Sequence, residues 1–236
     1  MENLQDRVVV VTGGSRGIGQ AIARACAEDG AQVAIIGRDR AALQQAVRQL
    51  RGRPISLAAD VTRPADVHRV FTLLRKQFGR IDILVNSAGV FTFKPFVKTT
   101  LSEWRRTIET NLTGLFLAIQ AALPLLEMGR NAHIVNVLSI SSRTAFENCS
   151  AYSAAKFGAL GFTRVLAKEL RPKKIRVTAI LPGPTNTRMI EGFGFPVERD
   201  EIIQPEDVAA AVLGALHTQP RATVEEVLIT PSKGSL

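Results

Sequence analysis

A run of four valines followed at once by a glycine-rich turn constrains the fold of this chain more than any other feature. Val8–Val11 is typical of a short parallel strand that is buried on both faces of a sheet. The turn, TGGSRGIG at residues 12–19, leads into a helical pattern that continues to Glu28. Strand, glycine turn and helix in this order predict an open α/β sheet with a nucleotide phosphate site at the start of its first helix.

The glycines of this turn are spaced differently from the common G-x-G-x-x-G pattern. They stand at Gly13, Gly17 and Gly19, where they would let the backbone turn tightly and approach a pyrophosphate. A tight turn without a ligand is the alternative interpretation. The position between a buried strand and a helix favours nucleotide binding, in which Ser15, Arg16 and Ile18 would also take part.

Strand and helix patterns alternate along the rest of the chain. Further strands are predicted at Val33–Ile36, Ile55–Ala59, Ile81–Val85, Ile134–Leu138, Ile175–Leu181 and Glu226–Thr230. This alternation predicts a Rossmann-type, doubly wound parallel sheet of about seven strands with helices on both faces. The length of 236 residues suits one such domain, over residues 1–236.

The end of the second strand predicts which dinucleotide would bind. An acidic residue commonly holds the ribose 2′-hydroxyl there, but Gly37 occupies this position and Arg38 follows. Arginine can hold a 2′-phosphate with two charge-assisted hydrogen bonds, and Arg16 can reach the same region. The sequence therefore predicts NADP(H) rather than NAD(H), although Asp39 could face the ribose if the register shifted by two residues.

Polar and small residues at two other strand ends extend this predicted site. Asp60, followed by Val61, could accept a hydrogen bond from the adenine amino group or cap the turn at Thr62–Pro64, and the two roles have equal weight. The stretch Asn86–Gly89, with Ala88, consists of small residues that leave room for a cofactor at the crevice of the sheet.

A hydroxyl, a phenol and an amine stand at fixed spacing in the second half of the chain. Tyr152, the one tyrosine of the sequence, precedes Lys156 by four residues, so both lie on one helix face. A nearby positive charge lowers the pKa of a phenol, so we expect Tyr152 to act as a general acid and base. Ser139, at the end of a strand, would donate a hydrogen bond to a substrate oxygen.

Three further features of the second half bear on the site. Asn111 is a polar residue among apolar helix neighbours, and could tie Lys156 to solvent through a water. The segment PGPTNT at 182–187 stops a strand sharply, and its hydroxyls could bind an amide or a phosphate. Residues 188–204 combine glycines with Met189, Phe193 and Phe195, which is typical of a substrate lid, with a plain surface loop as the alternative.

Composition excludes several other classes of protein. The 2 cysteines and 3 histidines lack metal-ligand spacing, so we expect no metal site and no disulfide framework. The net charge of +9 comes from dispersed basic residues, which suits an anionic cofactor better than nucleic acid. The polar N-terminus leaves no room for a signal peptide, and the apolar stretch Leu115–Leu126 is too short to span a bilayer. We therefore expect a cytoplasmic protein without a membrane or nucleic-acid partner.

Taken together, these motifs resemble those of the classical short-chain dehydrogenase/reductase family. The resemblance extends from Arg7 to about Thr230 and rests on several motifs in the expected order. It implies that Asn111, Ser139, Tyr152 and Lys156 form a catalytic tetrad. It also implies an NADP(H) site made by the residues named above, including Pro182, Gly183, Thr185 and Thr187, with Lys156 lowering the pKa of Tyr152 and binding the nicotinamide ribose.

The resemblance implies hydride transfer between NADP(H) and a carbonyl or secondary alcohol. Similarity to 3-oxoacyl-carrier-protein reductases makes a 3-oxoacyl thioester one candidate substrate. An NADP-dependent alcohol or sugar dehydrogenase and a non-catalytic NADPH-binding regulator are the alternatives. Members of the family commonly assemble through the helices that carry Asn111 and Tyr152, so we expect a homo-oligomer, either a tetramer or a dimer.

Overall fold

A computed structural model describes residues 3–193 and 198–234 as a seven-stranded sheet in the order β3-β2-β1-β4-β5-β6-β7. All strand pairs within it are parallel. The strands are β1 Val8–Thr12, β2 Gln32–Gly37, β3 Ile55–Ala58, β4 Ile83–Asn86, β5 His133–Val137, β6 Arg176–Pro182 and β7 Glu226–Ile229. The predicted doubly wound parallel sheet is confirmed, with strand ends shifted by one or two residues.

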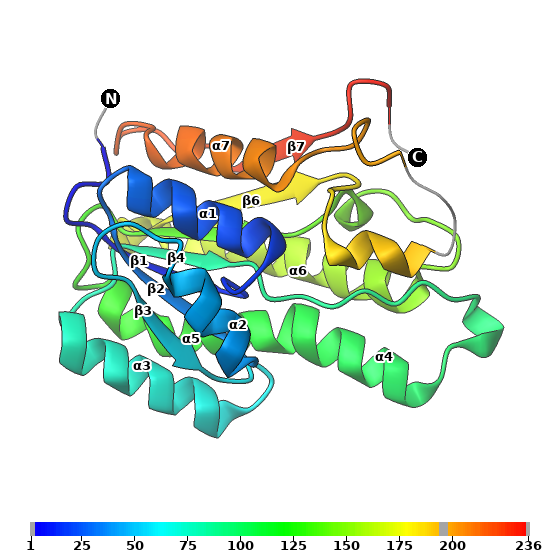
Figure 1. Cartoon of the computed structure of the whole chain (residues 1–236), viewed down its shortest axis with the longest axis horizontal. Coiled ribbons are helices and arrows are strands. Elements are labelled where there is room, and N and C mark those ends of the chain that lie inside the picture. The colour runs from blue at the N-terminus through cyan, green and yellow to red at the C-terminus, as the bar shows by residue number, and fades with distance from the viewer. Residues whose placement is uncertain (1–2, 194–197, 235–236) are drawn as a thin grey trace.

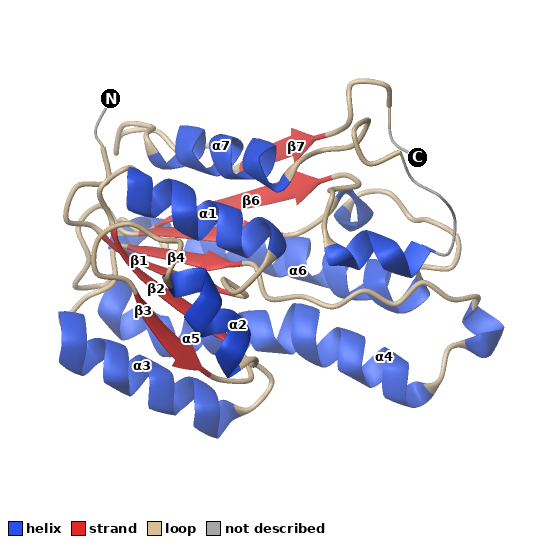
Figure 2. Ribbon diagram, viewed as in Figure 1, coloured by secondary structure: helices blue, strands red, loops and turns tan. Residues whose placement is uncertain are grey.

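Helices cover both faces of this sheet (Figures 1 and 2). They are α1 Gly17–Glu28, α2 Arg40–Val47, α3 Pro64–Phe78, α4 Leu101–Ile108, α5 Gly114–Leu126, α6 Ser150–Glu169 and α7 Pro205–Leu216. Short turns of 3-10 helix lie at η1 Phe96–Lys98, η3 Ile140–Ser142, η4 Arg171–Lys173 and η5 Arg188–Phe193, and a π-helical turn lies at η2 Glu109–Thr113.

The valines of β1 show how one strand supports two hydrophobic cores. Val10 packs into the core that α3, α5 and α6 cover, whereas Val9 and Val11 pack into the core beneath α1, α2 and α7. Successive side chains of a strand point to opposite faces. A strand between two helix layers therefore needs apolar residues at every position, which is why the four valines predicted it.

The apolar stretch Leu115–Leu126, which by itself is too short to span a bilayer, belongs to a longer helical stretch, Leu101–Leu126. Helices α4 and α5 join through η2 into 26 helical residues, long and apolar enough to cross a membrane by length and composition alone. Leu115, Ile119 and Leu126 are buried in the core against the sheet. This packing identifies α5 as a core helix of the α/β fold, as the sequence predicted.

The strand order reverses direction between β1 and β4, which lie side by side although two strands, β2 and β3, separate them in sequence. In open parallel sheets, a ligand crevice forms outside the carboxyl ends of the strands at such a point. The glycine turn follows β1, and Asn86–Gly89 follows β4, so the fold brings these two predicted motifs to the same edge.

Candidate active site

A cleft of about 1180 Å³ runs along the carboxyl edge of the sheet. The loops after β1, β2, β3, β4, β5 and β6 all contribute to its walls. It begins at the glycine turn and reaches Tyr152 and Lys156 on α6. The cleft is large enough for a dinucleotide together with a small substrate.

The glycine turn needs glycine at two positions for different reasons. Gly13 has a φ of +71°, and a Cβ there would lie 2.7 Å from the backbone nitrogen of Ala88. At Gly19, a Cβ would lie 2.4 Å from the carbonyl oxygen of Gly13. Any side chain would therefore push the turn away from α1 or from the loop after β4.

The N-terminus of α1 is suited to an anion. The residue at its N-cap, Arg16, makes no side-chain cap, and no acidic residue lies in the first turn. The backbone N–H groups of that turn thus carry the partial positive charge of the helix into the cleft. This is the arrangement that a pyrophosphate requires.

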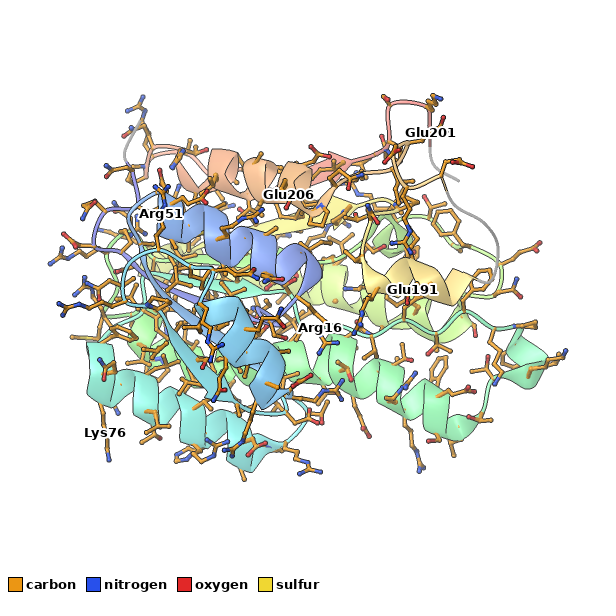
Figure 3. All side chains as sticks on the ribbon, viewed as in Figure 1. Arg16, Arg51, Lys76, Glu191, Glu201 and Glu206 are labelled. Carbon is orange, nitrogen blue, oxygen red and sulfur yellow. The ribbon has the colours of Figure 1, made fainter. Side chains whose placement is uncertain are left out.

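Two arginines at the far end of the cleft each pair with a carboxylate. Arg16 lies near the N-terminal end of α1 (Figure 3), with its guanidinium 3.0 Å from Asp39. Arg38 lies 3.9 Å from Asp60. Asp39 also caps α2 by accepting a hydrogen bond from the Ala42 backbone, and this bond is the main cause that lowers its pKa. Asp39 is therefore held as a helix cap.

Asp60 takes the capping role that was one of its two predicted roles. Its Oδ1 accepts hydrogen bonds from the Thr62 backbone nitrogen at 3.0 Å and the Thr62 hydroxyl at 2.8 Å. It still lines the cleft with Val61. The second predicted role, a hydrogen bond between the Asp60 carboxylate and an adenine amino group, stays a prediction.

Tyr152 and Lys156 are both buried on the same face of α6, as their spacing predicted. The Lys156 amine lies 5.6 Å from the centroid of the Tyr152 ring. It donates a hydrogen bond of 3.2 Å to the carbonyl oxygen of Val137, the last residue of β5. The two side chains reach the cleft at its inner end.

Burial governs the proton affinities of this pair, in the opposite direction from our expectation for the phenol. Burial raises the pKa of Tyr152 to about 12, against a smaller lowering by the Ser139 hydroxyl. Burial also lowers the pKa of Lys156 to about 8. Because a low-dielectric site disfavours both charged forms, the predicted lowering of the phenol pKa by Lys156 is not seen.

Ser139 is fixed by the turn that follows β5. Its hydroxyl oxygen accepts a hydrogen bond of 3.1 Å from the backbone nitrogen of Ser141 and so caps η3. The hydroxyl interacts with Tyr152. This capping bond orients the Ser139 oxygen and leaves its own proton for donation.

Asn111 lies in the π-helical turn η2, a kind of turn that is frequent at functional sites. Its amide nitrogen donates to the carbonyl oxygens of Val90 and Thr107, each at 2.9 Å, and its oxygen accepts from the Val90 backbone at 3.3 Å. The side chain thus joins the helix to the loop after β4.

A second, much smaller cavity of about 10 Å³ lies behind the cleft wall. Asn86, Asn111 and Lys156 are among the residues that line it. Its volume is close to the minimum for one water molecule, about 10–15 Å³. This cavity is where a water linking Asn111 to Lys156, as the sequence suggested, would fit.

The structure does not bring Asn86 into the cleft, contrary to its predicted cofactor contact. Its amide nitrogen donates a hydrogen bond of 2.9 Å to Asn136 on β5, and its Oδ1 has no hydrogen-bond partner among the described residues. Asn136 in turn donates to Thr163 on α6. Because Asn86 is the last residue of β4 and is buried within the sheet, its side chain points into the small cavity region rather than outward.

Most other predicted site residues do line the cleft. They are Gly13, Ser15, Arg16, Gly17, Ile18, Gly19, Arg38, Asp60, Val61, Ala88, Gly89, Tyr152, Lys156, Pro182, Gly183, Thr185 and Thr187. Asn111 lines the small second cavity, whereas the buried Ser139 lines neither cavity, although its neighbours Leu138 and Ile140 line the cleft. Phe91 and Phe93, which also line the cleft, were missed because no motif marks their loop, whereas Phe146 and Cys149 belong to the loop at residues 140–150, which the sequence connects with pocket specificity without placing its side chains.

The predicted lid is only partly described. Residues 188–193 form the 3-10 turns of η5, and Met189 and Ile190 line the cleft. The other end of the segment pairs with the loop after β6 through an isolated bridge between Thr185 and Ile203. Phe195, which the prediction included, lies outside the described residues.

Comparisons with known proteins agree with this arrangement. The chain matches the short chain dehydrogenase family over residues 7–194. An uncharacterized oxidoreductase of Staphylococcus aureus strain USA300 is 35% identical over 233 residues, which cover 98% of this chain and 100% of the relative. One of Staphylococcus saprophyticus is 33% identical over 235 residues, with the same coverage.

Solved structures give the same result. An alcohol dehydrogenase from the archaeon Thermococcus sibiricus, complexed with 5-hydroxy-NADP, has a TM-score of 0.88 at 26% identity and covers 98% of this chain and 99% of its own. A short chain dehydrogenase from Burkholderia cenocepacia J2315 in complex with NADP also has a TM-score of 0.88, at 32% identity, covering 97% and 98%.

Proposed function

The chain belongs to the short-chain dehydrogenase family, and we propose that it is an NADP(H)-dependent oxidoreductase that interconverts a carbonyl group and a secondary alcohol. One observation carries the proposal. The glycine turn and the Tyr152–Lys156 pair open into the same cleft, so a dinucleotide bound at one end would reach the phenol at the other. Two similar solved structures are complexes with NADP or a modified NADP.

The residues around the cleft fit this cofactor. A Cβ at Gly13 or Gly19 would fill the turn that approaches the pyrophosphate, and the first turn of α1 carries no acidic side chain. Arg16 and Arg38 are half exposed or more and could turn from their carboxylate partners toward a 2′-phosphate. Exposed ion pairs of this kind contribute less than about 1 kcal/mol, so a doubly charged phosphate can displace them.

The side chains divide the chemistry between them. Tyr152 would give its proton to the substrate oxygen in reduction and remove it in oxidation. Ser139, oriented by Ser141, would hold that oxygen through a hydrogen bond. Lys156 would stabilise the phenolate that remains. When bound, NADP(H) supplies or accepts the hydride; the protein orients the substrate and moves the proton.

Lys156 is also placed to pass a proton inward. Its amine lies at the wall between the cleft and the small cavity near Asn111. A pKa of about 8 keeps most of this amine protonated near neutrality while leaving a neutral fraction. One water in the small cavity would let Lys156 exchange its proton after Tyr152 has reacted.

The alternatives differ in direction or in chemistry. An NADP-dependent alcohol or sugar dehydrogenase would use the same groups in reverse, and a 3-oxoacyl thioester is one substrate for the reductive direction. A non-catalytic NADPH-binding regulator would not need a buried phenol beside a buried amine. Burial of Lys156 costs free energy, as its lowered pKa indicates, which favours a catalytic role for the pair.

Replacement of Tyr152 by phenylalanine tests the proposal. We expect kcat/KM for the substrate to fall by about 10²–10⁴, the usual contribution of a general acid or base, because the ring stays but the proton donor is lost. The Kd for NADPH, measured by fluorescence titration, should change little. Ser153→Ala on the same helix is the control. Unchanged turnover in Tyr152→Phe would reject the role of the phenol, and absence of turnover in the wild type would favour the regulator.

A further inference from the structure

The substrate end of the cleft is lined by phenylalanines from two loops that lie far apart in the sequence. Phe91 and Phe93 belong to the loop after β4, and Phe146 belongs to the loop between η3 and α6. All three line the cleft, as Tyr152 does. None of them belongs to a motif that the dinucleotide site explains.

Two of these rings form a chain of aromatic contacts with Tyr152: Phe91 contacts Tyr152, and Phe93 contacts Phe91. The Phe91 ring meets the Tyr152 ring edge-on, with centroids 4.8 Å apart and planes at 89°. The Phe93 ring stacks beside Phe91 at 6.0 Å and 24°. Both arrangements are the favoured geometries of aromatic pairs. A substrate whose carbonyl meets Tyr152 would therefore lie along a row of aromatic rings.

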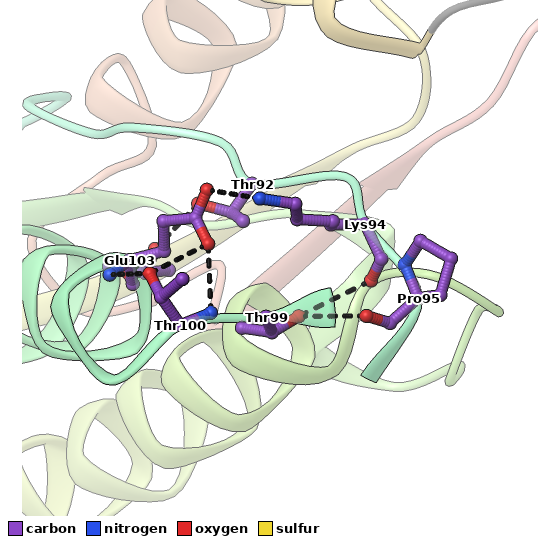
Figure 4. A network of polar contacts seen from close by, with 7 residues as sticks. Thr92, Lys94, Pro95, Thr99, Thr100 and Glu103 are labelled. Carbon is purple, nitrogen blue, oxygen red and sulfur yellow. Dashed lines mark hydrogen bonds and ion pairs between the residues drawn. The ribbon is translucent and has the colours of Figure 1, made fainter. Parts of the chain in front are cut away.

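Polar contacts fasten the loop that carries Phe93 to helix α4 (Figure 4). The Lys94 amine lies 2.8 Å from the Glu103 carboxylate, which also closes the capping box with Thr100. The Thr92 hydroxyl lies 2.9 Å from that of Thr107, which fastens the loop to α4. These contacts bracket Phe93 on both sides in the sequence and limit its movement.

A backbone hydrogen bond joins the two phenylalanine loops directly. The Lys94 nitrogen donates to the carbonyl oxygen of Asn148 at 2.6 Å. The loop that carries Phe146 thus closes against the loop that carries Phe91 and Phe93. We call the space that these three rings line beside Tyr152 the aromatic slot.

Further apolar side chains line the aromatic slot, beside the polar Ser141 and Asn148 of the same loop as Phe146. Ile140, Cys149 and Ile190 line this end of the cleft, and the last two are buried. Glu147 and Arg188 line its mouth and are exposed to solvent. Among the described residues that line the cleft, Lys156 is the one buried charged side chain.

This lining disfavours charged and polyhydroxylated substrates. An unpaired carboxylate or phosphate in an apolar site loses its hydration without compensation. Sugar hydroxyls would likewise lose hydrogen bonds that phenylalanine rings cannot replace. A flat apolar group, in contrast, would stack on Phe93 and Phe91 and exclude water from the reacting carbon.

We propose that the substrate is an uncharged carbonyl compound, or the matching secondary alcohol, that carries an aryl group next to the reacting carbon. The inference rests on the oxidoreductase function proposed above and adds its substrate class. In the reductive direction the C=O π bond is replaced by a C–H bond, formed with hydride from the reduced nicotinamide, and an O–H bond, formed with the proton of Tyr152. The oxidised cofactor and the alcohol are released.

The experiment compares NADPH oxidation with five carbonyl compounds. They are acetophenone, cyclohexyl methyl ketone, 4-acetylbenzoate, a 3-oxobutyryl thioester and an aldose. We expect the highest kcat/KM for acetophenone, about tenfold above cyclohexyl methyl ketone, which has a similar size but no flat ring. We expect 4-acetylbenzoate to react more slowly still, because its carboxylate would enter an apolar slot.

Phe93→Leu tests the slot itself. We expect the preference for acetophenone over cyclohexyl methyl ketone to approach one, mainly through a higher KM, with an unchanged Kd for NADPH. Phe146→Leu is the second variant, and thermal unfolding checks that both variants fold. The matched control is Phe96→Ala in the same loop, since Phe96 is 77% exposed and should leave the preference unchanged.

The outcomes separate the substrate class from the function. Turnover that favours the aldose, the thioester or the charged ketone would overturn the aryl assignment and leave the oxidoreductase in place. Absence of all turnover would overturn the function, and calorimetry with 1-phenylethanol and NADP⁺ would then test the slot alone. Binding that Phe93→Leu weakens and Phe96→Ala does not would support the slot; absence of binding would overturn it.

Discussion

At the scale of single residues, the proposed binding of a 2′-phosphate depends on two arginines, Arg16 and Arg38, that are paired with carboxylates in the structure. Arg38 is 62% exposed at its side chain and lies 3.9 Å from Asp60, a separation that makes the ion pair weak. Asp39 is committed to the cap of α2 and to Arg16. The Asp39 carboxylate is therefore held at the N-terminus of α2 by its bond to the Ala42 backbone, which argues against the ribose contact that Asp39 raised as an objection to NADP(H) in the sequence.

Arg38→Ala tests this arrangement. Hydrogen bonds to charged groups contribute about 1.5–3 kcal/mol, so we expect kcat/KM with NADPH to fall by tenfold or more. The value with NADH should change little, since NADH lacks the 2′-phosphate. Steady-state kinetics with both cofactors measures the ratio. Arg40→Ala, in the first turn of α2, is a matched control, and an unchanged ratio in Arg38→Ala would contradict the NADP(H) assignment.

Lys156 and Tyr152 show why the spacing of two residues in the sequence does not determine their pKa values. The four-residue interval correctly places both on one face of α6. Burial then moves both pKa values toward the neutral forms, to about 12 for Tyr152 and about 8 for Lys156. A positive charge, from Lys156 or from an oxidised nicotinamide, would have to act against this burial before Tyr152 can ionise readily.

At the scale of elements, α4 anchors the loop that forms the aromatic slot. Its first turn is a capping box in which the Thr100 hydroxyl accepts from the Glu103 backbone while the Glu103 carboxylate accepts from the Thr100 backbone. The same carboxylate binds Lys94, and these hydrogen bonds lower the pKa of Glu103 to about 2. Glu103 thus stabilises the start of α4 and also binds the loop that carries Lys94.

Thr100→Ala removes half of this box. Loss of an N-cap hydroxyl typically costs about 1 kcal/mol of stability, and we expect the urea unfolding midpoint to fall accordingly without a change in the m-value. Ser102→Ala, at an exposed position of the same turn, is the control and should leave the free energy of unfolding within about 0.5 kcal/mol of the wild type. An equal loss in both variants would show that the cap itself contributes nothing.

At the scale of the whole molecule, acid stability depends on a histidine at the start of β5. His133 is fully buried, and its Nε2 lies 2.7 Å from the Thr178 hydroxyl. The Thr178 hydroxyl donates to the carbonyl oxygen of Val224, so the Nε2 of His133 is the donor to Thr178. Burial, assisted by the charges of Arg176 and Arg7, lowers the pKa of His133 to about 3.

The sign of the effect on stability follows from this shift. The unfolded chain binds a proton at His133 near its ordinary pKa of about 6.5, whereas the folded chain binds it only near pH 3. Stability is therefore lost as pH falls from about 6.5 toward 3, by up to about 1.4 kcal/mol per pH unit. We expect His133→Gln to flatten this acid limb in urea unfolding, while His68→Gln at an exposed site leaves it unchanged. The same slope in both variants would assign the acid sensitivity to other groups.

The outer face of α5 and α6 carries the apolar side chains that we expect to mediate self-association. Phe116 is 42% exposed, Val165 is 51% exposed, and the Phe116 ring lies 6.1 Å from Phe162. These residues bridge the two helices on the side away from the sheet. A charge at the centre of such a face should oppose association between copies, because it would be buried without a partner.

Phe116→Glu should therefore shift the protein toward the monomer in light scattering coupled to size exclusion. Val97→Glu is the control, because Val97 is 86% exposed on a separate loop and should not change the mass. A wild-type monomer at micromolar concentration would contradict the expected oligomer directly.

Much of the fold follows from local patterns, because each pattern is satisfied within a few residues. The four valines predict a strand buried on both faces, the glycine turn needs its positive φ at Gly13, and the capping box predicts the start of α4. The helical interval between Tyr152 and Lys156 likewise needs no tertiary information. These features determine the order of the elements and one end of the candidate site.

Only the tertiary structure decided what lies between those motifs. It placed Asn86 behind the cleft because the last residue of β4 faces Asn136 on the neighbouring strand. It gathered Phe91, Phe93 and Phe146 from two loops without a shared pattern, since the hydrogen bond that closes them joins residues far apart in the chain. Burial, which set the proton affinities of Tyr152 and Lys156, is a property of the packed molecule and of no single stretch of sequence.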